Sequence, residues 1–194
     1  MNHSETLLEI KDLCVEFKTM AGTVHAVDHL SYTLHRGEKL GIVGESGSGK
    51  SVSSLAMMQL IPNPPGKVTG GQILYNGKDL VKLSEREMQK IRGKEIALIP
   101  QNPTESLNPI RRIGKQLTEC MTVHGNKDKE LANSRRDEFL RRFGFADPDR
   151  ISRAYSFQLS GGMNQRVISA MGLMNRPKWV IADEPTKGLD AILR

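Results

Sequence analysis

The sequence predicts an α/β fold with a mostly parallel sheet. Short apolar segments that are typical of buried strands occur at 95–99 and 179–182, and each is separated from the next by helical sequence. A glycine-rich turn at 44–51 lies between an apolar run and a helical stretch. Strands that alternate with helices in this way favour a parallel sheet covered by helices.

The first part of the chain predicts strands followed by one helix. Residues 7–17 alternate apolar and polar side chains, as a half-buried strand does, and 24–34 predicts a second strand. The apolar run 39–43 predicts a strand that ends at glycines. Residues 52–61 predict a helix, which the prolines and glycine of 62–66 should stop.

A hairpin and a short helix are expected next. Residues 71–75 lead into Asn76-Gly77, a dipeptide that suits a tight hairpin turn. Ser84 and Glu87 match a capping box, which predicts a helix that ends near residue 92.

The residue pattern of the sequence changes after the strand expected at 95–99. From about 101 to 158, charged helical stretches replace apolar strands, most clearly at 128–143, and Gly144 suits the end of that helix. A further helix is expected over 161–175, before the last strand.

Composition and charge argue against a disordered chain, a membrane-spanning protein and a secreted protein. The chain has 194 residues, ordinary composition, no apolar run long enough to span a bilayer and no signal-peptide pattern. Cys14 and Cys120 lie far apart and outside any metal-binding spacing, which predicts reduced thiols. The net charge of +6 is not gathered in one block, so a solvated surface is favoured over a nucleic-acid or anionic-lipid partner.

The strongest chemical motif is a phosphate-binding loop that matches G-x-x-x-x-G-K-[ST] in full. Its glycines let backbone N–H groups point at phosphate oxygens, and the following helix adds its dipole. Lys50 is expected to meet the β- and γ-phosphates, and Ser51 to bind Mg²⁺. The loop consists of Gly44, Glu45, Ser46, Gly47, Ser48, Gly49, Lys50 and Ser51.

A second motif places two carboxylates directly after the strand expected at 179–182. Because neighbouring strand residues point in opposite directions, Asp183 and Glu184 should have different roles. Asp183 is expected to hold Mg²⁺, and Glu184 to act as general base on an attacking water.

A third motif, Leu-Ser-Gly-Gly at 159–162, opens the helix expected over 161–175. Ser160, Gly161 and Gly162 could form an anion site there. An ordinary helix cap at Ser160 followed by flexible glycines explains the same residues.

These three motifs, in this order, resemble the ATP-binding cassette (ABC) family, and residues 159–166, LSGGMNQR, are similar to its LSGGQ signature. The resemblance implies a P-loop NTPase with a RecA-like sheet, an N-terminal antiparallel β part and a helical subdomain. It implies one incomplete ABC ATPase domain over 1–194, with the core at 1–100, the helical subdomain at about 101–158, and the signature, Walker B and D-loop at 159–194.

The family's other site residues map onto this sequence one by one. Gln101 resembles the Q-loop glutamine, which senses Mg²⁺, the attacking water and the membrane partner. Phe17 resembles the aromatic residue that stacks on adenine, although a core phenylalanine in a strand explains it equally well. Gln165 belongs to the nucleotide-binding signature, and Asp190 resembles the D-loop aspartate, in a partial match.

Residues 102–109 and Met163 narrow the resemblance to the dipeptide, oligopeptide and nickel importer ATPases of bacteria, with Pro100 as a departure where that group usually has Phe. This implies an ATPase on the cytoplasmic face of the membrane that uses ATP and Mg²⁺. Its implied partners are a second ATPase subunit, transmembrane permease subunits and, indirectly, an external solute-binding protein. No nucleic-acid partner is expected.

The family's switch-loop histidine follows the D-loop, after a helix and one more strand. Histidines 3, 25, 29, 35 and 124 all precede the signature, so the sequence predicts a truncated chain with weak or no ATP turnover. Two alternatives remain: an ABC-type ATPase that acts on DNA or the ribosome, and a nucleotide-binding fragment without turnover.

Overall fold

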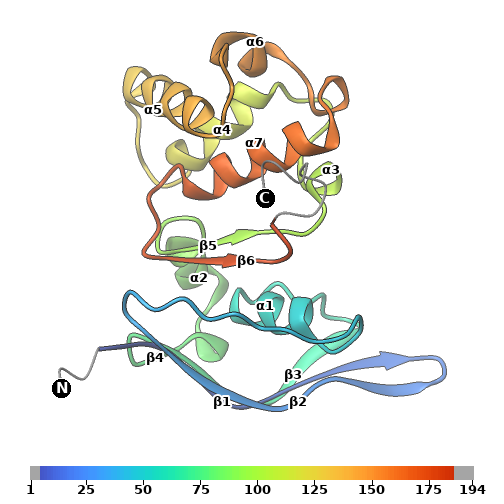
Figure 1. Ribbon diagram of the computed structural model, residues 1–194. Helices are drawn as coiled ribbons and strands as arrows, with labels where there is room; N and C mark the ends of the chain where they lie inside the picture. The colour runs from blue at the N-terminus through green and yellow to red at the C-terminus, as the bar shows by residue number, and fades with distance from the viewer. Residues whose placement is uncertain (1–4, 186–194) are drawn as a thin grey trace. The chain divides into compact units, whose positions relative to one another are not determined.

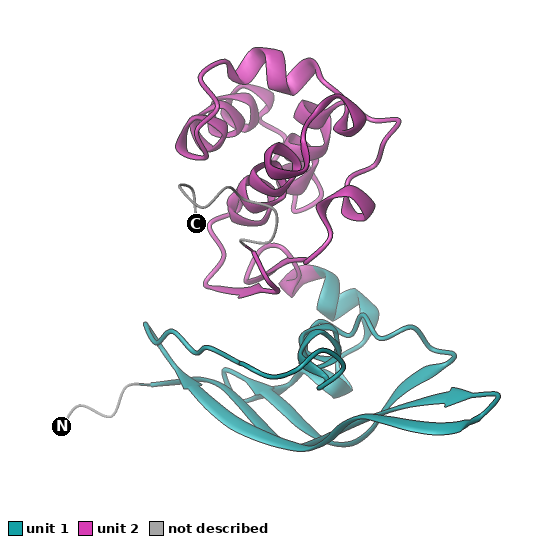
Figure 2. Cartoon of the chain, turned by 45° about the vertical axis from the view of Figure 1, so that its right-hand side comes forward, with its two compact units in different colours: residues 1–89 teal, residues 90–194 magenta. Residues whose placement is uncertain are grey.

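The computed structural model describes residues 5–185 of the chain. Asp190, the expected D-loop aspartate, lies outside the described residues. The chain forms two compact units, residues 1–89 and residues 90–194 (Figure 2). The phosphate-binding loop belongs to the first unit, whereas Gln101, the signature and the adjacent carboxylates belong to the second.

The first unit is built on a four-stranded antiparallel sheet (Figure 1). The strand order is β2-β1-β3-β4, with β1 and β2 forming a long ribbon. Leu8, Ile10, Leu13 and Ile73 are fully buried, which confirms the half-buried strand predicted at 7–17. The strands are β1 (Thr6–Thr19), β2 (Gly22–His35), β3 (Gly66–Tyr75) and β4 (Lys78–Asp79).

The hairpin between β3 and β4 confirms the turn predicted at Asn76-Gly77. Tyr75 pairs with Lys78, so the loop has two residues. Asn76 has φ 47° and Gly77 has φ 78°, and both angles are positive, as a type I′ turn requires. Asparagine and glycine enter this left-handed region more readily than other residues do.

The next helices are α1 (Lys50–Met57) and η1 (Leu80–Lys82), both in the first unit, and α2 (Glu85–Ile91), which begins in the first unit and ends in the second. The capping contact predicted at α2 is present, because the Ser84 N–H donates to the Glu87 carboxylate at 2.9 Å. The sequence predicts that α1 ends at residue 61, but the helix ends four residues earlier. Gln59 has φ 49°, and its side chain donates to the backbone carbonyls of Leu80 and Leu83, so the chain leaves the helix before the prolines.

The strand predicted at 39–43 is wrong. These residues have no strand structure and take part in no strand ladder of the described chain. Leu40, Ile42 and Val43 are exposed, Val43 by 97%. An apolar run becomes a strand only when neighbouring strands satisfy its backbone N–H and C=O groups and cover its side chains. Residues 5–185 supply this segment with no such neighbour.

The second unit joins a two-stranded parallel sheet to a group of helices (Figure 1). Its core contains Leu117, Leu140 and Val167, from three different helices. The Asp128 cap and Gly144 at φ 80° confirm the helix expected at 128–143. The elements are β5 (Ile96–Ile99), α3 (Pro103–Ser106), α4 (Ile113–Thr122), α5 (Lys129–Arg142), α6 (Pro148–Arg153), η2 (Ser156–Gln158), α7 (Gly161–Leu173) and β6 (Trp179–Ala182).

Two further expectations concern membranes and thiols. Within residues 5–185, no helix is both long enough and apolar enough to cross a bilayer. Cys14 and Cys120 are free cysteines, as expected. Burial raises the pKa of the Cys120 thiol to about 11, so it is protonated at neutral pH.

Candidate functional site: a phosphate loop and a carboxylate edge

The phosphate-binding loop ends the segment that connects β2 to α1, and its last two residues, Lys50 and Ser51, begin the helix. Gly47 and Gly49 have φ 85° and φ 88°, values that a residue with a side chain adopts only with strain. Gly49 is also the N-cap of α1, and its C=O accepts a hydrogen bond from the Ser53 N–H at 2.8 Å. The loop therefore delivers the chain directly into the positive end of a helix dipole.

Gly49 lies against the backbone of β2. A Cβ atom at Gly49 would come within 2.3 Å of the Ala26 carbonyl oxygen and 3.3 Å of the Val27 side chain. The motif pattern alone explains a glycine by its positive φ, but the structure adds this steric reason. Sequence reasoning missed the role of Ala26, and no signal in the pattern marks it.

The Lys50 ammonium group is turned toward the loop that precedes it. It donates to the carbonyl oxygens of Gly44 and Glu45, each at 2.7 Å, and to the Ser48 hydroxyl at 3.3 Å. Three oxygen atoms thus surround the charge, at the distances that phosphate oxygens would take. The loop is also braced by a hydrogen bond from the Ser48 N–H to the Glu45 carbonyl.

We expect Gly49→Ala to reduce ATP binding by more than about tenfold. The new methyl group would meet the Ala26 carbonyl, and it would sit on a left-handed residue, so the loop must move. Gly47→Ala is the matched control, because Gly47 has a similar φ but a Cβ added there would meet no atom within 4 Å. Calorimetric titration with Mg-ATP measures both; equal affinities of the two variants would contradict the steric argument.

Phe17, the expected adenine-stacking residue, packs within the sheet of the first unit. It pairs with Val24 on β2 and Gly66 on β3, and is half-buried. Its ring lies 2.6 Å from the position that a Cβ of Gly66 would occupy. The ring therefore covers the glycine backbone, which is a packing role, and adenine stacking stays a prediction.

The predicted catalytic residues meet at one edge of the parallel pair β5–β6. Ile99 pairs with Ala182, and the Asp183 N–H donates to the Ile99 carbonyl at 2.9 Å. Beyond these strand ends, the Gln101 side-chain amide donates to the Glu184 carboxylate at 2.5 Å. Two residues that are 83 positions apart in sequence are thus in direct contact, beside Asp183.

Glu184 holds a strained backbone conformation. Its φ of 46° lies in the left-handed region, which costs a residue with a side chain about 1–2 kcal/mol. Such strain is concentrated at sites where a side chain must take one particular direction. Here it accompanies the contact between the Glu184 carboxylate and the Gln101 amide.

The signature residues surround the first turn of α7. Ser160 is the N-cap, and its hydroxyl accepts from the Met163 N–H at 3.3 Å. Ser160 and Gly161 are exposed, and a side chain at Gly161 would meet nothing within 4 Å. The helix start is thus open to a ligand.

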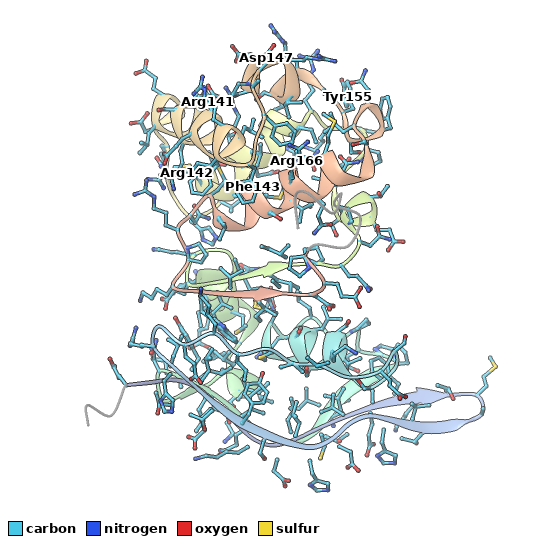
Figure 3. All side chains as sticks on the ribbon, viewed as in Figure 1. Arg141, Arg142, Phe143, Asp147, Tyr155 and Arg166 are labelled. Carbon is cyan, nitrogen blue, oxygen red and sulfur yellow. The ribbon has the colours of Figure 1, made fainter. Side chains whose placement is uncertain are left out.

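Gln165 differs from the other signature residues because its side chain is buried, with 1% of its surface exposed. Nucleotide binding by this glutamine stays a prediction. The adjacent Arg166 makes contacts with residues that follow α5. Its guanidinium group donates to the Phe143 and Gly144 carbonyls and lies over the Phe145 ring (Figure 3). These contacts fix α7 to the chain segment that follows α5.

The family assignment follows from a comparison with known sequences. The profile of the family described as "ABC transporter" matches residues 27–187, which include all three motifs. The chain belongs to the ABC transporter family.

Several curated ABC relatives are peptide transport proteins. The oligopeptide transport ATP-binding protein OppD of Bacillus subtilis is 51% identical over 97% of this chain and 52% of its own length. The dipeptide transport ATP-binding protein DppD of Escherichia coli is 45% identical over 97% of this chain and 57% of its own length. The chain thus spans about half the length of the curated relatives it matches.

Solved ABC structures share the fold. The dimeric ATP-binding cassette MJ0796, solved in a post-hydrolysis state with ADP and Pi, gives a TM-score of 0.86 at 26% identity over 96% of this chain and 78% of that chain. CbiO1 from Clostridium perfringens, part of the ABC transporter complex CbiONQ, gives a TM-score of 0.74 at 26% identity. The match covers 98% of this chain and 70% of that chain. These similarities confirm the predicted α/β ABC ATPase fold class.

Proposed function

We propose that this chain is the ATP-binding and ATP-hydrolysing part of an ABC importer for peptides or a related small solute such as nickel. The observation that carries the proposal is the contact between Gln101 and Glu184 beside Asp183. An amide, a prospective general base and a prospective metal ligand share one strand edge, which is the set of groups that phosphoryl transfer to water needs. The peptide transport names of the OppD and DppD relatives support the substrate class.

Each group of residues has its own chemical role in the proposed reaction. The loop 44–51 would supply N–H donors and the Lys50 charge to the phosphates, and Ser51 and Asp183 would each offer an oxygen ligand to Mg²⁺. Glu184 polarises the attacking water, and Gln101, whose amide donates to the Glu184 carboxylate, would orient that carboxylate and contribute to holding Mg²⁺. Ser160, Gly161 and Gly162 of one subunit face the γ-phosphate that is held by its partner.

The proposed partners follow from this arrangement. A second ATPase subunit completes the nucleotide site, as the dimeric structure of MJ0796 supports. The permease subunits contact the segment after Gln101 on the cytoplasmic face of the membrane, where the change caused by ATP-driven dimerisation reaches them. An external solute-binding protein supplies the solute. The alternatives, an ABC-type ATPase on DNA or the ribosome and a binding fragment without turnover, are separated by nucleic-acid binding at graded salt and by phosphate release.

Nucleotide-driven dimerisation tests the proposal. In a Glu184→Gln background, Mg-ATP should convert the chain from monomer to dimer, measured by light scattering. Adding Gly161→Arg should abolish the dimer, because the new side chain meets open space in the single chain but occupies the face offered to the partner.

The matched control is Ser134→Arg, which puts the same side chain on an exposed position of α5. It should dimerise like the Glu184→Gln parent. A parent that stays monomeric with Mg-ATP, or a Gly161→Arg variant that dimerises as well as the Ser134→Arg control, would contradict the proposed arrangement.

A further inference from the structure

The β1–β2 ribbon carries a group of metal-ligating side chains that the nucleotide chemistry does not use. The strand register shifts between Ile10 and Leu13 and again between Leu13 and Val15. Residues 12 and 14 on β1 and residues 28 and 29 on β2 occupy this irregular region. Bulges of this kind redirect side chains that a regular strand would alternate between two faces.

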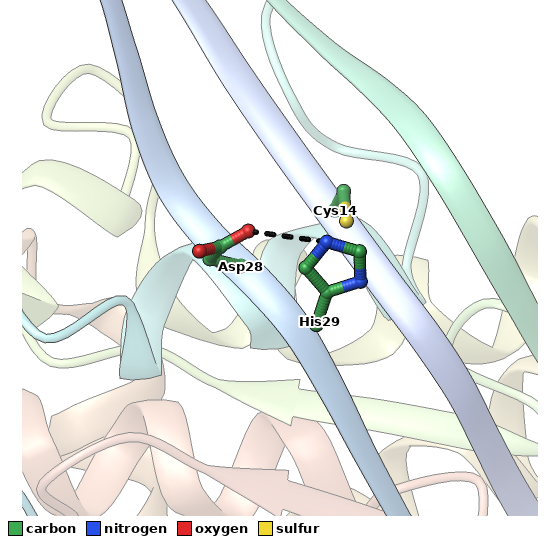
Figure 4. A group of neighbouring side chains, drawn as sticks. All are labelled: Cys14, Asp28 and His29. Atoms are coloured by element: carbon green, nitrogen blue, oxygen red, sulfur yellow. Dashed lines mark ion pairs between the residues drawn. The ribbon is translucent and has the colours of Figure 1, made fainter.

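Three of these side chains converge on one point. One ligand atom each from Cys14, Asp28 and His29 lies within 4.8 Å of the other two (Figure 4). The His29 Nε2 atom is 3.7 Å from the Asp28 carboxylate. Ligands around a tetrahedral Zn²⁺ are about 3.3–3.8 Å apart, given bonds of about 2.0–2.3 Å. Asp28 and His29 are exposed, so small side-chain rotations can close the remaining gap.

Asp12 fixes the orientation of the imidazole. Its carboxylate contacts the His29 Nδ1 atom at 2.6 Å, which places the ring proton on Nδ1 and leaves the Nε2 lone pair for the side of Asp28. Metal-binding histidines commonly donate their second ring nitrogen to a carboxylate in this way. Both Asp12 and His29 hold left-handed backbone angles, φ 53° and φ 49°, so the contact is made at a local conformational cost.

We propose that Cys14, Asp28 and His29 form a binding site for a divalent transition metal ion of the Zn²⁺ class, oriented by Asp12. Sulfur and imidazole ligands select such ions over Mg²⁺ and Ca²⁺, which prefer oxygen. The site is separate from the nucleotide chemistry, because none of its residues belongs to the three ATP motifs. The Cys14 thiol also donates to the Asp12 backbone carbonyl at 3.6 Å. A plain histidine–carboxylate pair accounts for the His29–Asp12 contact, and the metal site is inferred from the thiol and the second carboxylate that converge on the opposite ring nitrogen.

The test is Zn²⁺ titration of the reduced chain by calorimetry, with Co²⁺ as a spectroscopic probe. We expect saturable binding of one ion and a thiolate-to-cobalt charge-transfer band. Cys14→Ser should remove that band, and His29→Ala should weaken Zn²⁺ binding at least about tenfold. Asp12→Asn should weaken it by about 10- to 100-fold, because Asp12 acts only through the histidine.

Two matched controls separate this site from adventitious binding. His25→Ala changes another exposed histidine on β2, one that pairs with Glu16, and should bind Zn²⁺ like the wild type. Cys120→Ser removes the other thiol and should keep the cobalt band. Thermal melting without metal verifies that each variant is folded. Absence of saturable binding, wild-type affinity in both Cys14→Ser and His29→Ala, or loss of the band in Cys120→Ser alone would overturn the proposal.

Discussion

Replacing Glu184 by glutamine is expected to slow ATP hydrolysis by about 10²–10⁴-fold, the usual contribution of a general base, while ATP binding is retained. Glutamine has nearly the same shape as glutamate and still offers an oxygen that can accept the hydrogen bond from the Gln101 amide. It therefore preserves the contact at the strand edge and removes only the basic carboxylate. Phosphate release and calorimetric ATP titration on the same preparations measure the two effects.

The control for this experiment is Glu130→Gln, an exposed position in the first turn of α5. It makes the same chemical change away from the proposed site and should hydrolyse ATP at the wild-type rate. If Glu184→Gln and Glu130→Gln turn over ATP equally, at a rate above background that the wild type shares, Glu184 is not the general base. If Glu184→Gln loses ATP binding as well as turnover, its role is structural.

Replacing Lys50 by alanine is expected to weaken Mg-ATP binding by about 10- to 100-fold, the range for loss of a hydrogen bond between charged groups. The Lys50 ammonium is already surrounded by three oxygen atoms of its own loop, so it is positioned for phosphate oxygens. The variant also loses those loop contacts, and its thermal stability must therefore be measured together with its affinity.

Lys129→Ala is the matched control, because this exposed lysine is likewise the first residue of a helix. It should bind Mg-ATP like the wild type. Thermal melting verifies that both variants are folded. If Lys50→Ala and Lys129→Ala then bind Mg-ATP with equal affinity, the loop 44–51 does not bind the phosphates.

The features that sequence predicts best are those set by neighbouring residues. The Asn76-Gly77 turn, the Ser84–Glu87 contact and the helix end at Gly144 each depend on local backbone geometry, and each is present. The strand prediction for 39–43 is wrong for the opposite reason. Strand structure there depends on a partner strand from elsewhere in the chain, so apolar character alone cannot decide it.

In the candidate site too, local features could be predicted from sequence and features that depend on strand pairing could not. The loop 44–51 is a local motif and could be found in full, whereas the contact between Gln101 and Glu184 depends on which strands are neighbours. The group around His29 could not be found by spacing, because Cys14 is 15 positions away in the chain and meets it only through strand pairing. One local signal existed: the buried positions Ile10, Leu13 and Val15 break the period of two, which marks a bulge.

The pairing of Ile99 with Ala182 has a consequence for how this chain can change during evolution. Gln101 and Glu184 each follow their paired strand residue by two positions, so the two connections have equal length. Inserting or deleting one residue in either would displace a side chain by about 3.3 Å and turn it toward the other face. Length variation should therefore accumulate in surface turns such as 124–127, while these two short connections keep their length in every functional descendant.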